Sequence, residues 1–142
     1  TFSNGVAYCF FSRNANSKIS IRRGTDNTMQ VYINGTERNF GSWTPATSTW
    51  FHVAVARSGS NLRVFIDGAQ LGSTATDGNA ISDTTGITIG RLSSGGEEIN
   101  GWIDEFRISS SARWTTTFTP PTGPYCAVPN LIAFFENFKP IG

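Results

Sequence analysis

The chain has 142 residues, a length that fits one domain with a buried hydrophobic core. Only 15% of its residues are charged and the net charge is +1 without a basic run, which argues against a nucleic-acid partner. No apolar stretch reaches the roughly 18 residues that a membrane span needs, which argues against membrane insertion.

Solubility must therefore come from uncharged polar residues, mainly Ser, Thr, Asn and Gly. Such a surface is common in secreted, cell-surface and virion proteins, so we expect an extracellular or virion location. The chain begins almost directly inside an apolar run, and we expect it to be part of a larger chain or assembly.

The first third of the chain alternates short β-compatible runs with polar turns. Asn34-Gly35 separates two of these runs, and this dipeptide favours a type I′ hairpin because both central residues need a positive φ. The strands expected here are Val6–Ser12, Ile19–Arg22, Met29–Ile33 and Thr36–Phe40.

The middle of the chain contains the clearest hairpin, formed by the runs 50–57 and 62–67. The four-residue connection between them is short enough to make the two runs antiparallel neighbours. In the second run Leu62, Val64 and Ile66 point to one face, while Phe65 and its alternate neighbours point to the other. Asp67-Gly68 then predicts another tight turn.

The rest of the chain continues the pattern of short runs. Ser109–Trp114 fits one short helical turn, but no window keeps a 3.6-residue period over three turns. At least eight short runs separated by turns favour a β-sandwich or a barrel. The later runs expected as strands are Gln70–Ser73, Ile87–Leu92, Trp102–Ile108 and Asn130–Phe138.

Four motifs, taken in order, resemble one family. They are W-x-H-V-A at 50–54, I-D-G at 66–68, I-x-I-G at 87–90 and G-x-I-D-E-x-R-I at 101–108. This set is similar to the laminin-G-like branch of the concanavalin A-like lectin/glucanase superfamily over about residues 43–121. The resemblance implies a two-sheet antiparallel jelly-roll β-sandwich. The segments 112–114 and 118–121 resemble a version frequent in bacteriophage structural proteins.

The resemblance also implies that the sandwich is incomplete. Members of this branch carry further strands before the one that resembles Val6–Ser12, so the domain at residues 1–121 lacks its usual N-terminal strands. Residues 122–142 are expected to be a Pro-containing connector and a C-terminal strand, which packs on the sandwich or on a neighbour. Unpaired sheet edges need such a cover.

Carboxylates on a strand are the catalytic signal of the glucanases in this superfamily, and Asp104-Glu105 is the one candidate here. Adjacent residues in a strand point to opposite faces, and Trp102 and Phe106 stand where further acids would be needed. His52 is the only histidine and has no nucleophile at a useful spacing. We therefore expect no enzyme activity and no catalytic residues.

No cofactor is expected, although calcium has weak candidates. Laminin-G-like domains often bind calcium at the sandwich rim, and oxygen atoms of Asp77, Asn79 and Asp83 are available in a loop that resembles this rim. A second acidic cluster is Glu97-Glu98. The alternative is that Asp-Gly-Asn is turn chemistry alone.

Sugar binding would need an exposed aromatic side chain. Trp43 and Trp114 lie in loop-like contexts and are the candidate ligand-binding residues, with packing over the sandwich edge as the alternative. Trp50 and Trp102 lie in strand patterns, for which burial is expected.

The sequence leaves three hypotheses about function. The first is a non-enzymatic surface module that binds a protein subunit or a surface glycan, such as a virion decoration, fibre or tail-associated protein. The second is a self-assembling structural subunit whose strands are completed by neighbouring chains, and the remote third is a glycoside hydrolase. Cys9 and Cys126 are either bridged or two buried thiols. The expected inner-face residues are Val53, Val55, Leu62, Val64, Ile66, Ile87, Ile89, Phe106 and Ile108.

Overall fold

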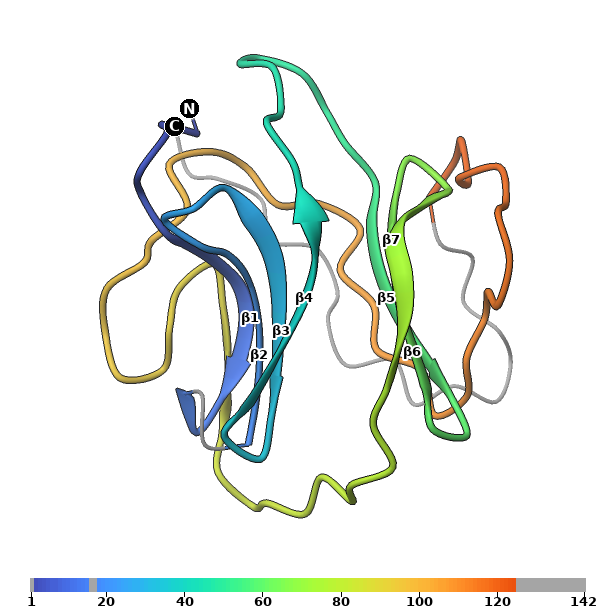
Figure 1. Cartoon of the computed structure of the whole chain (residues 1–142). Coiled ribbons are helices and arrows are strands. Elements are labelled where there is room, and N and C mark those ends of the chain that lie inside the picture. Colours follow the sequence, from blue (N-terminus) through green and yellow to red (C-terminus); the bar gives the residue numbers. More distant parts are fainter. Residues whose placement is uncertain (1, 16–17, 125–142) are drawn as a thin grey trace.

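The computed structural model of the chain describes residues 2–15 and 18–124. These residues form two antiparallel sheets, with strand orders β4-β3-β2-β1-β8 and β5-β6-β7 (Figure 1). The all-β, two-sheet sandwich expected from the sequence is thereby confirmed. The strands are β1 (Tyr8–Arg13), β2 (Ile19–Arg23), β3 (Thr28–Ile33), β4 (Thr36–Ser42), β5 (Val53–Ser58), β6 (Asn61–Ile66), β7 (Ala69–Thr76) and β8 (Ile87–Ile89).

The two turns predicted at Asn34-Gly35 and Asp67-Gly68 are present. Asn34 and Gly35 have φ values of 48° and 76°, and they join β3 to β4. Asp67 and Gly68, with φ values of 49° and 82°, join β6 to β7. Positive φ at both central residues is the geometry that a type I′ turn requires, so the turn chemistry was predicted correctly.

Two expected elements are absent from the part of the chain that the structure describes. Residues 102–108 form no strand, and residues 109–114 form no helical turn. No helix among the described residues is long and apolar enough to cross a membrane. The expected strand Asn130–Phe138, the rest of the tail from residue 125 and Cys126 lie outside the described residues.

The core lies between the two sheets. Leu62 and Val64 of β6 are buried in it, and Val53, Val55 and Ile66 pack against it, as predicted. The members from the larger sheet are Met29, Val31, Ile33 and Phe40.

The other four predicted inner-face residues are exposed, so their predicted burial is wrong. The exposed fractions are 40% for Ile87, 38% for Ile89, 38% for Phe106 and 57% for Ile108. Ile87 and Ile89 belong to β8, a three-residue strand at the edge of its sheet, which no further strand covers among the described residues. Phe106 and Ile108 lie in the segment that forms no strand.

The sandwich is closed at one side and open at the other. At the closed side β4 lies against β7, where a Cβ on Gly72 would lie only 1.7 Å from the carbonyl oxygen of Phe40. Because no side chain fits there, the glycine lets the two edge strands approach each other. At the open side the edge strands are β8 and β5.

A buried arginine joins the N-terminal segment to the turn between β2 and β3 and to the residue that follows β4. Arg23 is 0% exposed, and its Nε donates to the carbonyl oxygen of Trp43 at 2.8 Å. Its Nη atoms donate to the carbonyl of Ser3 at 3.1 Å and to the side-chain oxygens of Asn4 and Asn27. Burial lowers the pKa of this guanidinium. The hydrogen bonds offset the cost of burying the charge because each N–H of the guanidinium points at an oxygen.

We predict that Arg23→Met lowers the free energy of unfolding by about 3 kcal/mol, because the substitution leaves several buried acceptors without a donor. Chemical denaturation measures this change. Arg91→Met, at an exposed arginine, is the control and should change stability by less than about 0.5 kcal/mol. Equal stability of the two variants would contradict the structural role of Arg23.

Candidate functional site

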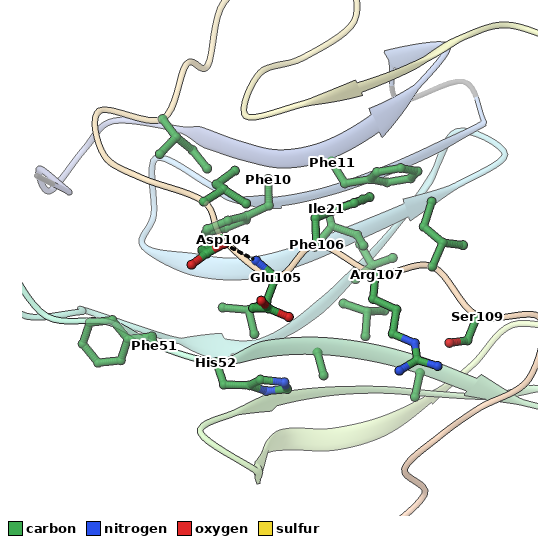
Figure 2. A pocket seen from close by; sticks show the side chains of 18 of the residues that line it. Phe10, Phe11, Ile21, Phe51, His52, Asp104, Glu105, Phe106, Arg107 and Ser109 are labelled. Atoms are coloured by element: carbon green, nitrogen blue, oxygen red, sulfur yellow. Dashed lines mark hydrogen bonds between the residues drawn. The ribbon is translucent and has the colours of Figure 1, made fainter. Parts of the chain in front are cut away.

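The open side of the sandwich leads into a cleft between the inner faces of the two sheets. Its cavity has a volume of about 1070 Å³ and is lined by residues of β1, β2, β3, β5, β6 and β8, by the loop before β5 and by residues 99–114. In Figure 2 Asp104, Glu105, Phe106 and Arg107 lie between the two sheets. We call residues 99–114 the crossing segment.

Local hydrogen bonding explains why the crossing segment is not a strand. Glu105 has a φ of 50°, which is left-handed backbone that a strand does not contain. Its N–H donates to Asp104 Oδ1 at 2.8 Å, so a side chain takes the donor that a ladder would use. The ring of Phe106 stacks on Phe11 of β1, with centroids 5.9 Å apart, and holds the segment against the larger sheet.

Two tryptophans that line the cleft are exposed to solvent. Trp50 is 66% exposed and Trp102 is 84% exposed, so the burial expected for both is wrong. Both residues follow a polar loop and are the first residues of the expected strands 50–57 and 102–108. That position is the sequence signal that could have identified them, because a residue at a strand end lacks cross-strand neighbours on one side.

The predicted ligand-binding tryptophans are half-buried and pack against other rings. Trp43 lies among Phe2, Phe10 and Phe51, with centroids at 5.9, 6.1 and 5.5 Å. Because Phe10 belongs to β1 and Phe51 precedes β5, this cluster links the two sheets. Ligand binding by Trp43 stays a prediction, and its geometry is that of a packing residue.

Trp114 is part of a second aromatic cluster, which covers Phe65. Its ring is stacked on Phe118 at 4.0 Å and 6°, and both rings meet the imidazole of His52 edge-on. Phe118 also packs on Phe65, which is 0% exposed, and donates its N–H to the carbonyl oxygen of Gly68. Packing is thus the observed role of Trp114 too.

His52 lies at the entrance of β5 and lines the cleft (Figure 2). Its backbone N–H donates to Asp67 Oδ1, and its carbonyl accepts from the N–H of Asp67, both at 2.8 Å. Partial burial lowers the pKa of the imidazole, and the nearby charge of Asp67 opposes this effect. The neutral imidazole therefore suits the aromatic contacts of the folded protein.

The predicted calcium ligands do not converge. The carboxylate of Asp77 is buried, forms ion pairs with Arg38 at 3.1 Å and Arg57 at 3.6 Å, and accepts the N–H of Asn79 at 3.0 Å. Asp83 accepts instead from the Asn14 amide and from the N–H of a residue in its own loop. These hydrogen bonds lower the pKa of Asp83 to about 2. The described residues contain no cluster of three or more His, Cys, Asp or Glu suited to a metal. Calcium binding stays a prediction.

Glu97, from the second acidic cluster, and the thiol residue Cys9 contact each other and neighbouring residues. Glu97 forms an ion pair with Arg22 at 2.6 Å, and its carbonyl accepts the N–H of Cys9 at 2.8 Å. Cys9 is 0% exposed, and burial together with the charge of Glu97 raises the pKa of its thiol to about 11. This thiol is therefore protonated near neutral pH.

Comparison with known proteins gives one family match and one similar solved structure. The family described as the concanavalin A-like lectin/glucanases superfamily matches residues 2–116 through a laminin G-type model. Among solved structures, the chain is similar to the 2.1 Å crystal structure of an S-layer domain-containing protein (residues 221–444) from Clostridium thermocellum ATCC 27405, at 20% identity and a TM-score of 0.38. That match covers 79% of this chain and 61% of the other, so it spans less than two thirds of the other chain. No curated protein matches the sequence.

We predict that stability falls as the pH is lowered through the ordinary histidine pKa of 6.5. The folded-state pKa of His52 is depressed, so the unfolded chain binds the proton more readily and gains relative stability below pH 6.5. Urea unfolding at pH steps between about 7 and 5 measures this loss, above the range in which ordinary carboxylates titrate.

His52→Phe is the matched variant because it keeps a ring between Trp114 and Phe118. It should remove the pH dependence in this window, since the chain contains no other histidine. An unchanged slope in the variant would contradict the role assigned to His52.

Proposed function

Because the chain belongs to the concanavalin A-like lectin/glucanase superfamily, we propose that it is a non-enzymatic module that binds a partner at a surface through the open cleft. A fold does not determine a function, so the proposal depends on the site. The observation that carries it is the solvent-exposed aromatic and apolar lining of a cavity of about 1070 Å³. Typical ligand sites are concave, mostly apolar and about 300–1,000 Å³ in volume.

The arrangement of the acids supports a role without catalysis. A retaining glycosidase needs two carboxyl groups roughly 5–5.5 Å apart on either side of the scissile bond. Among the described residues that line the cleft, the carboxylates are those of Asp104 and Glu105, which are neighbours in the chain, and Oδ1 of Asp104 accepts the N–H of Glu105. Trp102 and Phe106 flank this pair where further acids would be needed.

We place the module on an outer surface, in an extracellular or virion setting, as a decoration, fibre or tail-associated domain. The uncharged polar composition supports this location, as does the resemblance of segments 112–114 and 118–121 to phage structural proteins. Its partner is a protein subunit or a surface glycan.

We predict binding without turnover when the purified chain is tested by biolayer interferometry on immobilised polysaccharides and immobilised surface proteins. Ile108→Asp should weaken binding at least tenfold, because it adds an uncompensated charge to the apolar cleft lining. Ser94→Asp, in an exposed loop outside the cleft lining, is the charge-matched control.

Parallel incubation with laminarin and other β-glucans tests catalysis. We expect no release of reducing sugar. Release that persists through purification and disappears in Glu105→Gln would contradict the non-enzymatic proposal.

A second candidate function is self-assembly, which the exposed edge strand favours. Ile87 and Ile89 of β8 leave apolar surface at the open edge of the larger sheet. Unpaired sheet edges with apolar side chains associate readily with other chains. A neighbouring copy that adds a strand beside β8 would cover both side chains.

We predict on this second proposal that the chain elutes above its monomer mass of 15.4 kDa in size-exclusion chromatography with light scattering. Ile89→Lys should return it to a monomer, because edge lysines oppose strand addition. Ser94→Lys serves as the control. A sharp monomer peak for the unmodified chain at every concentration would rule out assembly through β8.

A further inference from the structure

The chain contains three asparagines that are followed by glycine: Asn4-Gly5, Asn34-Gly35 and Asn100-Gly101. Asparagine is a thermolabile residue, and a following glycine makes it more so because glycine has no Cβ to keep its backbone nitrogen away from the side chain before it. Attack of that nitrogen on the side-chain carbonyl carbon releases ammonia. The structure holds the three pairs in different ways, and this difference decides which of them can react.

The pair Asn34-Gly35 is held by its turn and by a side-chain contact. Its φ values of 48° and 76° form the tight turn between β3 and β4, which the paired residues Ile33 and Thr36 close. The side-chain amide of Asn34 donates to the carbonyl oxygen of Ala80 at 2.8 Å. Both contacts oppose the rotations that would bring Cγ of Asn34 to the nitrogen of Gly35.

The pair Asn4-Gly5 is held through the core. Gly5 has a φ of 74°, and Oδ1 of Asn4 accepts from Nη2 of Arg23 at 3.3 Å. Arg23 is itself 0% exposed and donates to the carbonyl oxygens of Ser3 and Trp43. The carboxamide of Asn4 is therefore tied to a buried side chain whose own position is fixed.

The pair Asn100-Gly101 lies in the crossing segment, where no strand follows it among the described residues. Both residues are exposed, and Gly101 has no positive φ. A Cβ on Gly101 would meet Ile99 Cγ2 at 3.7 Å, which is an ordinary contact distance, so the surroundings of this glycine are open. Irregular exposed backbone opens at little cost in free energy. The rotations that the reaction needs are therefore easier here than in the two turns.

We propose that Asn100 is a site of spontaneous deamidation, with the backbone nitrogen of Gly101 as the nucleophile and water as the second reactant. Hydroxide removes the N–H proton of Gly101, the nitrogen forms a bond to Cγ of Asn100, and the Cγ–Nδ2 bond breaks. Nδ2 takes up a proton and leaves as ammonia, and a succinimide ring remains. Water then adds to either ring carbonyl carbon and breaks its bond to the ring nitrogen, which gives an aspartate or an isoaspartate.

The product changes both the charge and the backbone of the crossing segment. A neutral side chain becomes a carboxylate in a segment that already holds Asp104, Glu105 and Arg107 between the sheets (Figure 2). An isoaspartate also carries the main chain through its Cβ, which lengthens the backbone between Ile99 and Trp102. An effect on partner binding in the cleft rests on the proposed function, whereas the deamidation itself does not.

Peptide mapping by mass spectrometry, during incubation of the purified chain at mildly alkaline pH, tests the proposal. We expect deamidation at Asn100 to be at least about tenfold faster than at Asn34, a ratio that corresponds to about 1.4 kcal/mol of protection by the turn. Asn4 should also react more slowly than Asn100. In concentrated urea the three rates should approach one another, because unfolding removes the contacts that distinguish the pairs.

Gly101→Ala is the matched variant. The new Cβ has room and the backbone needs no positive φ, so the fold should stay intact, and thermal unfolding checks this. The added methyl group hinders the attacking nitrogen, and we expect deamidation at Asn100 to slow about tenfold, which corresponds to about 1.4 kcal/mol in the transition state. The rates at Asn4 and Asn34 should not change.

Three outcomes would overturn the proposal: Asn100 stays unmodified in the folded chain, Asn34 or Asn4 reacts faster than Asn100, or Gly101→Ala reacts as fast as the unmodified chain. The proposed function fails separately. If Asn100 deamidates as expected but neither the fresh nor the incubated chain binds any immobilised polysaccharide or protein, the modification site stands without the binding function.

Discussion

The sandwich depends on the buried guanidinium of Arg23. A charge that is 0% exposed is stable only when its donors are satisfied, and here the partners come from three separate places in the chain. The partner with the widest effect is the carbonyl of Trp43, because the indole of that residue joins Phe10 of the larger sheet to Phe51 at the entrance of β5. The hydrogen bond from Arg23 to the carbonyl of Trp43 thus holds the indole of Trp43 between Phe10 and Phe51, and these ring contacts set the spacing of the sheets.

A second set of contacts decides where the sandwich can open. The buried carboxylate of Asp77, which follows β7, pairs with Arg38 of β4 and Arg57 of β5, and so ties both sheets together. Gly72 allows β7 to lie against β4 at the closed side. At the other side the three-residue strand β8 and the irregular crossing segment provide no equivalent contacts between sheet edges among the described residues. The cleft is therefore the side of the molecule at which strand pairing ends.

The difference between these sides explains what could be predicted from the sequence. Turns such as Asn34-Gly35 and the alternation of Leu62, Val64 and Phe65 are local, because φ preference and the two-residue period need no knowledge of distant partners. The family followed from ordered motifs of the same local kind. Burial of a side chain depends on which distant residues pack against it, and local patterns do not show this. Ile89 and Trp102 were therefore expected to be buried, but they are exposed.

Two further features lay beyond local patterns. Residues 102–108 read as a strand because their composition suits one, but a strand needs a partner, and the left-handed backbone of Glu105 breaks the ladder. Arg23 gave no signal at all, because its acceptors are mainly backbone carbonyls and asparagine side chains scattered over the first 43 residues. Exposure of Trp50 and Trp102 was missed for the same reason that the core was overestimated.

Exposed apolar surface also distinguishes the two proposed functions. Leaving an indole in water forgoes on the order of 3 kcal/mol of burial energy, so two exposed tryptophans favour any occupant that covers them. Trp50 and Trp102 line a concave cavity, which the first proposal fills with a bound partner. Ile89 lies outside the cavity lining, on an edge strand whose backbone can pair with another strand, a combination that selects a neighbouring chain. Because Ile87 of the same strand lines the cavity, the two proposed surfaces meet at β8.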